Sequence, residues 1–250
     1  MNYLVGDIGN TLIKLSILDD NFKIKKIYNF ETKKIFKKSF NNVILNGINI
    51  RKLNKYVLFS SVVPKAFKII TQGLRNKKFK VFELKDLKIK KILKINIKNY
   101  KHLGSDRISN AIGSLNYNNC LIIDFGTATT FDVIKKGVYE GGVISPGINQ
   151  SILNLNKSTA LLPILNLKST QKSYGKNTQE ALNAGFLWGY EGLINNIIKK
   201  ISFKAKTNFK IILTGGYARL FKKYIKNKTI IDKDFTIKGV ARAYKELIWK

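Results

Sequence analysis

Two segments of the 250-residue sequence carry an acidic residue directly after a short apolar run, followed by glycine and hydroxyl residues. The first contains Asp7 and runs from residue 3 to residue 11; the second contains Asp124 and runs from residue 121 to residue 132. Each pattern is typical of a β-hairpin whose turn brings backbone N–H groups and hydroxyls close to an anion. Since the copies stand about half a chain apart, we predict two related halves that close on one phosphate-bearing ligand.

A third candidate group is Gly104-Ser105-Asp106-Arg107, which opens a segment with helical spacing at residues 108–113. Two interpretations of this group are open. An acid at a helix start interacts favourably with the positive helix end and can pair with the arginine, so the pair can be purely structural. Alternatively, Asp106 is a general base and the planar guanidinium of Arg107 holds a substrate carboxylate.

Further glycines and a threonine are weaker candidates. The segment from Gly141 to Gly147 and the Thr214-Gly215-Gly216 turn would let backbone approach a ligand, and the second is expected between a strand and a helix. Both are equally consistent with ordinary turns. Thr178 stands where a long helix is expected to begin, so it either caps that helix or contacts a ligand.

The spacing of apolar residues predicts alternating strands and helices. Strands are expected at residues 3–8, 12–18, 22–30, 56–63, 80–84, 121–132 (as a hairpin) and 209–213. Helices are expected at residues 33–40, 65–75, 148–162, 178–200, 217–226 and 239–249.

The charge balance is unusual, because 46 Lys and Arg residues against 15 Asp and Glu residues give a formal net charge of +31. Such a charge normally indicates nucleic-acid binding. The lysines are spread along the whole chain, however, so we expect no nucleic-acid partner, although the field should attract anions such as ATP. One cysteine, Cys120, and the lack of an apolar run of about 18 residues favour a cytoplasmic protein with no membrane partner.

Taken together, the motifs resemble those of type III pantothenate kinases, in the superfamily of sugar kinases, actin and heat-shock ATPases. The matching segments, in the family's order, are residues 7–14, 103–107, 124–132, 141–147, 175–178 and 214–216. The Gly-Ser-Asp-Arg group before the second hairpin and the Gly-Gly to Pro-Gly segment after it narrow the resemblance to this family.

The resemblance implies an α/β fold of two ribonuclease-H-like (actin-like ATPase) halves, each a mixed five-stranded sheet with helices, with the nucleotide cleft between them. We place the halves at residues 1–115 and 116–250, since a turn-like stretch precedes the second hairpin. The resemblance also implies a homodimer with pantothenate bound at the subunit contact.

The activity implied is ATP-dependent phosphorylation of pantothenate to phosphopantothenate, the first step of coenzyme A biosynthesis, with Mg²⁺ and a monovalent cation, K⁺ or NH₄⁺. Asp106 would be the general base, Asp124 would bind the monovalent cation, and Asp7 would help to hold the Mg²⁺–phosphate group. The ATP-binding residues implied are Asp7, Ile8, Gly9, Asn10, Thr11, Leu12, Ile13, Lys14 and Thr127. The pantothenate-binding residues implied are Gly104, Ser105, Asp106, Arg107 and Thr178, the last across the dimer.

One segment departs from the family pattern. Family members often carry Tyr, Asn and Pro ahead of Leu-Gly, whereas this chain has Ile97, Asn99 and Tyr100. A tyrosine contact to pantothenate is therefore either lost or supplied by Tyr100. Two alternative functions are a regulatory or nucleic-acid-associated protein that keeps the fold, and a polyphosphate or nucleotide phosphatase.

Overall fold

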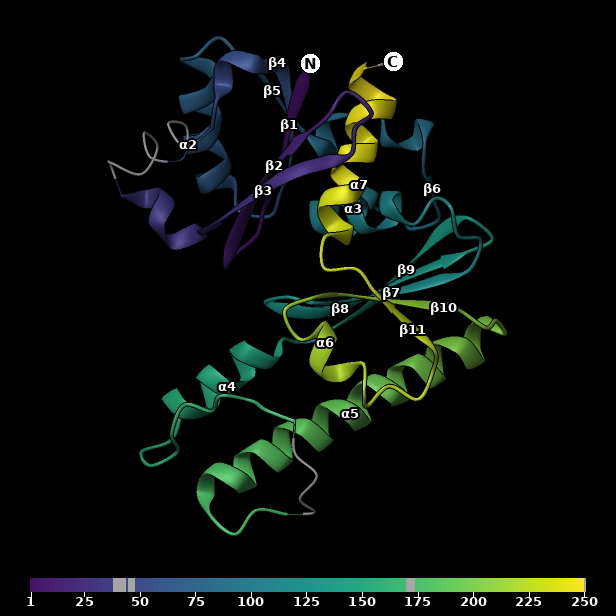
Figure 1. Cartoon of the computed structure of the whole chain (residues 1–250). Coiled ribbons are helices and arrows are strands. Elements are labelled where there is room, and N and C mark those ends of the chain that lie inside the picture. The colour runs from purple at the N-terminus through teal and green to yellow at the C-terminus, as the bar shows by residue number, and fades with distance from the viewer. Residues whose placement is uncertain (38–43, 45–47, 170–173, 250) are drawn as a thin grey trace. The chain divides into compact units, whose positions relative to one another are not determined.

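The computed structural model describes residues 1–37, 44, 48–169 and 174–249, and Figure 1 labels their elements. They form two compact units. The first comprises residues 1–116, 137–139 and 234–250, and the second comprises residues 117–136 and 140–233. The placing of two domains at residues 1–115 and 116–250 stays a prediction.

The first unit is built on a five-stranded mixed sheet with the order β3-β2-β1-β4-β5. Its strands are β1 (Asn2–Ile8), β2 (Leu12–Leu18), β3 (Ile24–Glu31), β4 (Leu53–Ser61) and β5 (Lys80–Glu83). Strands β1, β2 and β3 are joined antiparallel, whereas β1, β4 and β5 run parallel. The predicted hairpin at residues 3–18 is confirmed, because β1 and β2 pair antiparallel on both sides of a short turn.

Helices cover the first sheet. They are α2 (Pro64–Arg75), α3 (Ser105–Gly113) and α7 (Phe235–Tyr244), the last followed by a π-helical turn η6 (Lys245–Trp249). Short 3₁₀ turns are η1 (Thr32–Phe36), η2 (Ile50–Lys52), η3 (Leu84–Asp86), η4 (Ile89–Lys91) and η5 (Tyr100–His102). Helix α2 buries Ala66, Ile70 and Leu74 in the core beneath β1 and β4.

Helices α3 and α7 of the first unit cross closely (Figure 1). A Cβ on Gly239 would overlap the carbonyl of Ser109, so only glycine permits this approach of the two backbones. The buried hydroxyl of Thr236 donates a 2.8 Å hydrogen bond to Oδ1 of Asn110 at the same crossing. Helix α7 also packs on β1, and these contacts fix α3 relative to the first sheet.

The second sheet repeats this pattern with the order β11-β10-β7-β8-β9-β6. Its strands are β6 (Lys94–Ile95), β7 (Cys120–Phe125), β8 (Ala128–Lys135), β9 (Val138–Pro146), β10 (Lys210–Gly215) and β11 (Thr229–Ile231). Strand β7 pairs antiparallel with β8 and parallel with β10, as β1 does with β2 and β4. The expectation of two related mixed sheets is confirmed, but the expectation of five strands in each is wrong for the second sheet, which has six. The sixth strand, β6, is two residues long and pairs with Val138 and Tyr139.

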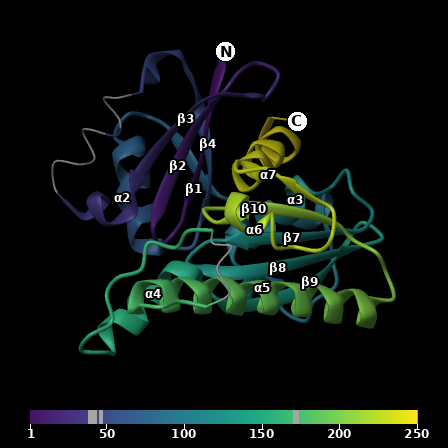
Figure 2. The same cartoon turned by 60° about the horizontal axis from the view of Figure 1, so that its bottom comes forward.

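The second unit contains helices α4 (Ile148–Lys157), α5 (Thr178–Ala205) and α6 (Ala218–Phe221). Figure 2 shows α5 lying along β7 and β8. One apolar cluster joins the sheet to Ile152 of α4, Leu187 and Ile194 of α5, and Phe221 of α6. In the described part of the chain, no helix is long and apolar enough to cross a membrane.

Several predicted helices are wrong in length. The helix expected at residues 148–162 ends at Lys157. Beyond it, Asn156 Nδ2 donates a 2.6 Å hydrogen bond to the Leu162 carbonyl, which holds the following segment, and Pro163 disfavours helical backbone at Leu162. The helix expected at residues 217–226 is only α6. There, Asn195 holds the following segment through hydrogen bonds with the Tyr224 carbonyl and the Lys226 amide.

The other helical boundaries differ for local reasons. The chain at residues 33–40 begins as the 3₁₀ turn η1, and residues 38–40 lie outside the described residues. The long helix continues five residues past residue 200, to Ala205. At the C-terminal end, helix α7 starts at Phe235, ahead of the expected residue 239.

Candidate active site

The first candidate turn joins β1 to β2 in the first unit. Asp7 lies opposite Lys14 in the hairpin, and the Gly9 amide donates a 3.0 Å hydrogen bond to the Leu12 carbonyl to close the turn. Asn10 and Thr11 are exposed at its tip. The turn therefore offers exposed residues with the Lys14 cation nearby, an arrangement that suits anion binding.

Not every residue of the predicted phosphate segment can use its side chain. Ile8 and Ile13 are fully buried in the hydrophobic core of the first unit. Only their backbone atoms could contact a ligand. Asp7 and Lys14, by contrast, are partly exposed, and Leu12 is 38% exposed.

The Gly104–Arg107 segment lies at the same sheet edge as Asp7. Strands β1 and β4 are parallel, so they end together, and the Val62 amide donates a 3.0 Å hydrogen bond to the Ile8 carbonyl. A Cβ on Gly104 would lie 3.7 Å from Cγ1 of Val62. The structure thus brings Asp7 and the start of α3 to the carboxyl ends of parallel strands, where ligands of open α/β sheets bind.

Asp106 stands in the first turn of α3 and is partly exposed. Its Oδ1 accepts a 2.8 Å hydrogen bond from the Arg107 amide. A Cβ on Gly104 would overlap this same oxygen, so the glycine leaves room for the carboxylate. The geometry agrees with an acid at a helix N-terminus and also leaves the carboxylate accessible to a substrate.

Residue Ser105, next to Asp106, is anchored from a distant strand. Its fully buried hydroxyl donates a very short hydrogen bond to Oε1 of Glu83, at the end of β5. Oε2 of Glu83 accepts a 2.7 Å hydrogen bond from the Lys85 amide. Burial raises the pKa of the Glu83 carboxyl, and the hydrogen bonds from Ser105 and Lys85 oppose that shift.

The second candidate turn joins β7 to β8 in the second unit and resembles the first. Asp124 lies opposite Thr130, and the Gly126 amide donates a 3.1 Å hydrogen bond to the Ala128 carbonyl. Gly126 and Thr127 are exposed, and Asp124 is partly exposed. The predicted hairpin at residues 121–132 is therefore confirmed.

Two glycines crowd against this turn. A Cβ on Gly147, the residue before α4, would overlap the Thr127 carbonyl. Gly215 has a φ of +85°, and a Cβ there would lie 2.6 Å from the Phe125 amide nitrogen and 2.7 Å from Oδ1 of Asp124. Only glycine fits at either position, so the backbone around Asp124 and Thr127 is tightly enclosed.

Tyr217 connects the segments that carry these glycines. Its hydroxyl donates a 2.5 Å hydrogen bond to Oδ1 of Asn149, in the first turn of α4. Partial burial, together with the neighbouring Tyr190, raises the pKa of the Tyr217 phenol. Hence Tyr217 acts as a neutral hydrogen-bond donor that holds the start of α4 beside the turn after β10.

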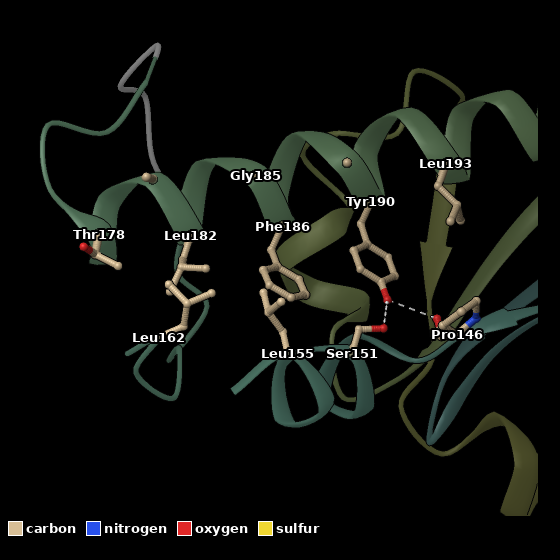
Figure 3. A pocket seen from close by; sticks show the side chains of 12 residues that line it. Pro146, Ser151, Leu155, Leu162, Thr178, Leu182, Gly185, Phe186, Tyr190 and Leu193 are labelled. Atoms are coloured by element: carbon tan, nitrogen blue, oxygen red, sulfur yellow. Dashed lines mark hydrogen bonds between the residues drawn. The ribbon is translucent and has the colours of Figure 1, made fainter. Parts of the chain in front are cut away.

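A groove of about 650 Å³ lies between α4 and α5 of the second unit (Figure 3). Phe186, Tyr190 and Leu193 of α5 line one wall, and Ser151 and Leu155 of α4 line the other. The Tyr190 hydroxyl lies 2.7 Å from the Ser151 hydroxyl and donates to the Pro146 carbonyl at 3.2 Å. The rest of the lining is mainly apolar.

Thr178 lines the end of this groove and is exposed. The interpretation of Thr178 as the helix cap is wrong. The cap is Asn177, whose Oδ1 accepts a 2.9 Å hydrogen bond from the Glu180 amide, while the Glu180 side chain accepts one of 3.1 Å from the Lys176 amide. Because Asn177 caps the helix, the Thr178 side chain is left available to a ligand.

A comparison of the sequence with known families identifies the one to which these motifs belong. The family model described as type III pantothenate kinase matches residues 3–200. The chain belongs to the type III pantothenate kinase family. A type III pantothenate kinase from Pelagibacter ubique is 47% identical over 245 residues, which cover 96% of this chain and 97% of that protein.

Solved structures agree on the fold of this family member. A Baf family protein from Campylobacter jejuni has a TM-score of 0.64 at 21% identity, covering 97% of this chain and 98% of that chain. Component A of (R)-2-hydroxyglutaryl-CoA dehydratase from Acidaminococcus fermentans has a TM-score of 0.54 at 11% identity, covering 97% and 96%. The predicted fold class, that of the sugar kinases and actin-like ATPases, is confirmed.

A kinase of this family uses ATP, generally with a metal ion. In the described residues, no three His, Cys, Asp or Glu side chains gather into a metal cluster. The partly exposed carboxylate of Asp7 in the first unit fits a hard cation that takes its remaining ligands from phosphate and water, as Mg²⁺ commonly does.

Two residues that shape the candidate site were missed from the sequence. Glu83 anchors Ser105, and Thr32 binds the first turn through hydrogen bonds to Gly9 and Thr11. Glu83 and Thr32 lie 22 and 23 residues away in sequence from Ser105 and Gly9. Neither forms part of a local motif, so no pattern in the sequence points to them.

Proposed function

We propose that this chain transfers the terminal phosphoryl group of ATP to the hydroxyl of pantothenate, the first step of coenzyme A biosynthesis, with Asp106 as the general base. The observation that supports this reaction is the match of residues 3–200 to the type III pantothenate kinase family. The role of Asp106 is supported by its partly exposed carboxylate at the sheet edge that also carries Asp7.

The residues of the first unit would divide the chemistry between them. The Asp106 carboxylate takes the proton of the pantothenate hydroxyl as that oxygen attacks the γ-phosphorus, and the bond from phosphorus to the ADP oxygen breaks. Gly104 to Arg107 line the pantothenate site, where the guanidinium of Arg107 would hold the substrate carboxylate through paired hydrogen bonds. The backbone from Gly9 to Lys14 would hold phosphate oxygens.

Bound cations would complete the charge balance. Asp7 would help to hold Mg²⁺, which neutralises phosphate charge when bound. Asp124 would bind a monovalent cation, K⁺ or NH₄⁺, and the exposed Thr127 would contact ATP. The support for these roles is that Asp124 and Thr127 share a turn enclosed by Gly147 and Gly215.

The protein would work as a homodimer in the cytoplasm. In the groove between α4 and α5 of the second unit, Leu155 is 36% exposed beside Leu182 and Phe186, an apolar face suited to a second copy of the chain. Thr178 at the end of this groove would contact the pantothenate of the partner subunit. Tyr100, in η5, is the candidate for the family's tyrosine contact to pantothenate.

The direct test is ADP release from the purified protein with ATP, Mg²⁺ and K⁺, with and without pantothenate. Asp106→Asn should lower pantothenate-dependent turnover by about a hundred- to ten-thousand-fold, because a positioned base is lost while the shape of the side chain is kept. Asp20→Asn, the same change at an exposed acid in the turn after β2, is the matched control and should keep wild-type turnover.

Other outcomes separate the alternatives. Phosphate release that ignores pantothenate would indicate a phosphatase. No turnover, with salt-sensitive binding of nucleic acid, would support the regulatory or nucleic-acid-associated function. Full pantothenate-dependent turnover by Asp106→Asn would support the reaction but would show that Asp106 is not its general base.

A further inference from the structure

Thr32 contacts the first candidate turn through two hydrogen bonds. Its Oγ1 donates to the Gly9 carbonyl at 2.6 Å, and its backbone amide donates to the Thr11 carbonyl at 3.0 Å. The residue is 2% exposed, so water does not compete for either bond. Both acceptors belong to the turn proposed to hold the phosphates of ATP.

The strand register explains how Thr32 reaches the turn. Leu12 of β2 lies opposite Glu31 of β3, which is the last pair of that ladder. Thr32 follows directly and begins η1, so its two bonds continue the contact of β3 from the strand into the turn itself. On the other side, the Gly9 amide closes the hairpin by donating to Leu12. Gly9 is thus held through its amide and its carbonyl by different partners.

We infer that Thr32 is a positioning residue for ATP, which fixes the turn at Gly9–Thr11 without touching the nucleotide. This inference rests on the proposed function, in which that turn binds phosphate. A turn whose amides must converge on an anion binds best when its backbone is already held in place. Loss of the Thr32 hydroxyl bond would loosen Gly9 and leave its carbonyl without this donor.

A buried threonine hydroxyl need not serve such a role, as Thr71 of α2 shows. Thr71 is 6% exposed in the same unit, and its Oγ1 has no hydrogen-bond partner among the described residues. Thr32 and Thr71 therefore form a matched pair. Replacing either by valine removes one buried hydroxyl at nearly constant shape, but only at Thr32 does a bond to the phosphate turn disappear.

The experiment compares Thr32→Val, Thr32→Ser and Thr71→Val with the wild type. Thr32→Val should lower kcat/KM for ATP by about three- to tenfold, the usual effect of one hydrogen bond, and leave KM for pantothenate within about twofold. Thr32→Ser keeps the hydroxyl and should restore the ATP parameters. Thr71→Val should behave as the wild type, and thermal melts should show every variant folded at the assay temperature.

The same proteins are titrated with MgATP by calorimetry, so that the inference and the proposed function can fail separately. Weaker MgATP binding by Thr32→Val alone supports the inference even where turnover is absent and the proposed reaction has failed. Unchanged ATP parameters in Thr32→Val overturn the inference while pantothenate-dependent turnover of the wild type upholds the function. An equal change in both substrates, or no rescue by serine, also overturns it. A wild type that neither binds MgATP nor turns over overturns both.

Discussion

At the scale of single residues, two side chains remote from the motifs hold the motifs in place. Glu83 accepts a hydrogen bond from the Ser105 hydroxyl at the start of α3, and the Thr32 hydroxyl donates one to the Gly9 carbonyl in the first turn. Glu83 connects a strand end to the start of a helix, and Thr32 connects a strand end to a turn; both of these segments carry proposed chemistry. Such residues act through the geometry of their neighbours, so their effects depend on shape and protonation more than on contact with a ligand.

The raised pKa of Glu83 predicts how stability depends on pH. Because the pKa is raised by burial in the folded state, the folded protein holds this proton more tightly than the unfolded chain. The stabilisation is complete below the pKa of the unfolded chain, near the ordinary glutamate value of 4.5, and is lost as the pH rises through the folded pKa. The free energy of unfolding of the wild type relative to Glu83→Gln should therefore fall as the pH rises through this range.

Urea unfolding of the wild type and of Glu83→Gln across this pH range measures the effect. Glu31→Gln is the control, for which the dependence of stability on pH should have the opposite sign. The hydrogen bond from Lys34, and then that from Lys33, lowers the pKa of the exposed Glu31 carboxyl. The stabilisation from Glu31 is present above its unfolded pKa and is lost as the pH falls, and solvent screening keeps it small. Slopes of the same sign for both variants would contradict the assignment for Glu83.

At the scale of elements, the second turn depends on how closely α4 and β10 approach it. Gly147 and Gly215 supply the space, and the hydrogen bond from Tyr217 to Asn149 joins the two segments. The β7–β8 turn, the start of α4 and the end of β10 lie side by side although they are far apart in the sequence. A single added methyl group should disturb this approach.

Gly147→Ala should weaken ATP binding, because its Cβ would displace the carbonyl of Thr127. Overpacking of this kind costs about 1–3 kcal/mol of stability, and the shifted turn should raise KM for ATP. Denaturant unfolding and steady-state kinetics measure the two effects. Gly192→Ala in α5, where nothing lies within 4 Å of the added Cβ, is the control and should gain helix stability with unchanged kinetics. Wild-type KM in Gly147→Ala would show that the turn tolerates displacement.

At the scale of the whole molecule, the two properties to consider are the net charge and the proposed association of two copies of the chain. The net charge of +31 is carried by lysines and arginines throughout the sequence, so it attracts ATP without marking one binding surface. The proposed dimer contact, by contrast, is confined to the groove between α4 and α5, which combines the exposed Leu155 and partly exposed leucines with glycines that carry no side chain.

Gly185→Lys should convert the proposed dimer into a monomer. Gly185 lines the groove, and a Cβ there meets nothing within 4 Å, so the folded subunit can accept a larger side chain that a partner subunit cannot. Light scattering should show half the wild-type mass, and KM for pantothenate should rise about tenfold through loss of the partner's Thr178. Gly185→Ala is the control and should remain dimeric. A wild-type mass for Gly185→Lys would remove this groove from the interface.

The sequence by itself determined the parts of the protein that depend on neighbouring residues. A short apolar run ending in an acid, followed by glycine and hydroxyl residues, was enough to predict the hairpins at Gly9 and at Gly126. The order of the motifs was enough to predict the fold class and the family. Local steric and hydrogen-bonding preferences act over a few residues, so they can be read directly from the chain.

Only the tertiary structure decided which distant residues support those parts. It ended α4 at Lys157, made Asn177 the cap in place of Thr178, and brought Glu83 to Ser105 and Thr32 to Gly9. Each of these features depends on strands and helices that meet only after folding. A hydrogen bond across more than twenty residues leaves no periodic trace in the sequence, because its partners are chosen by sheet order and register.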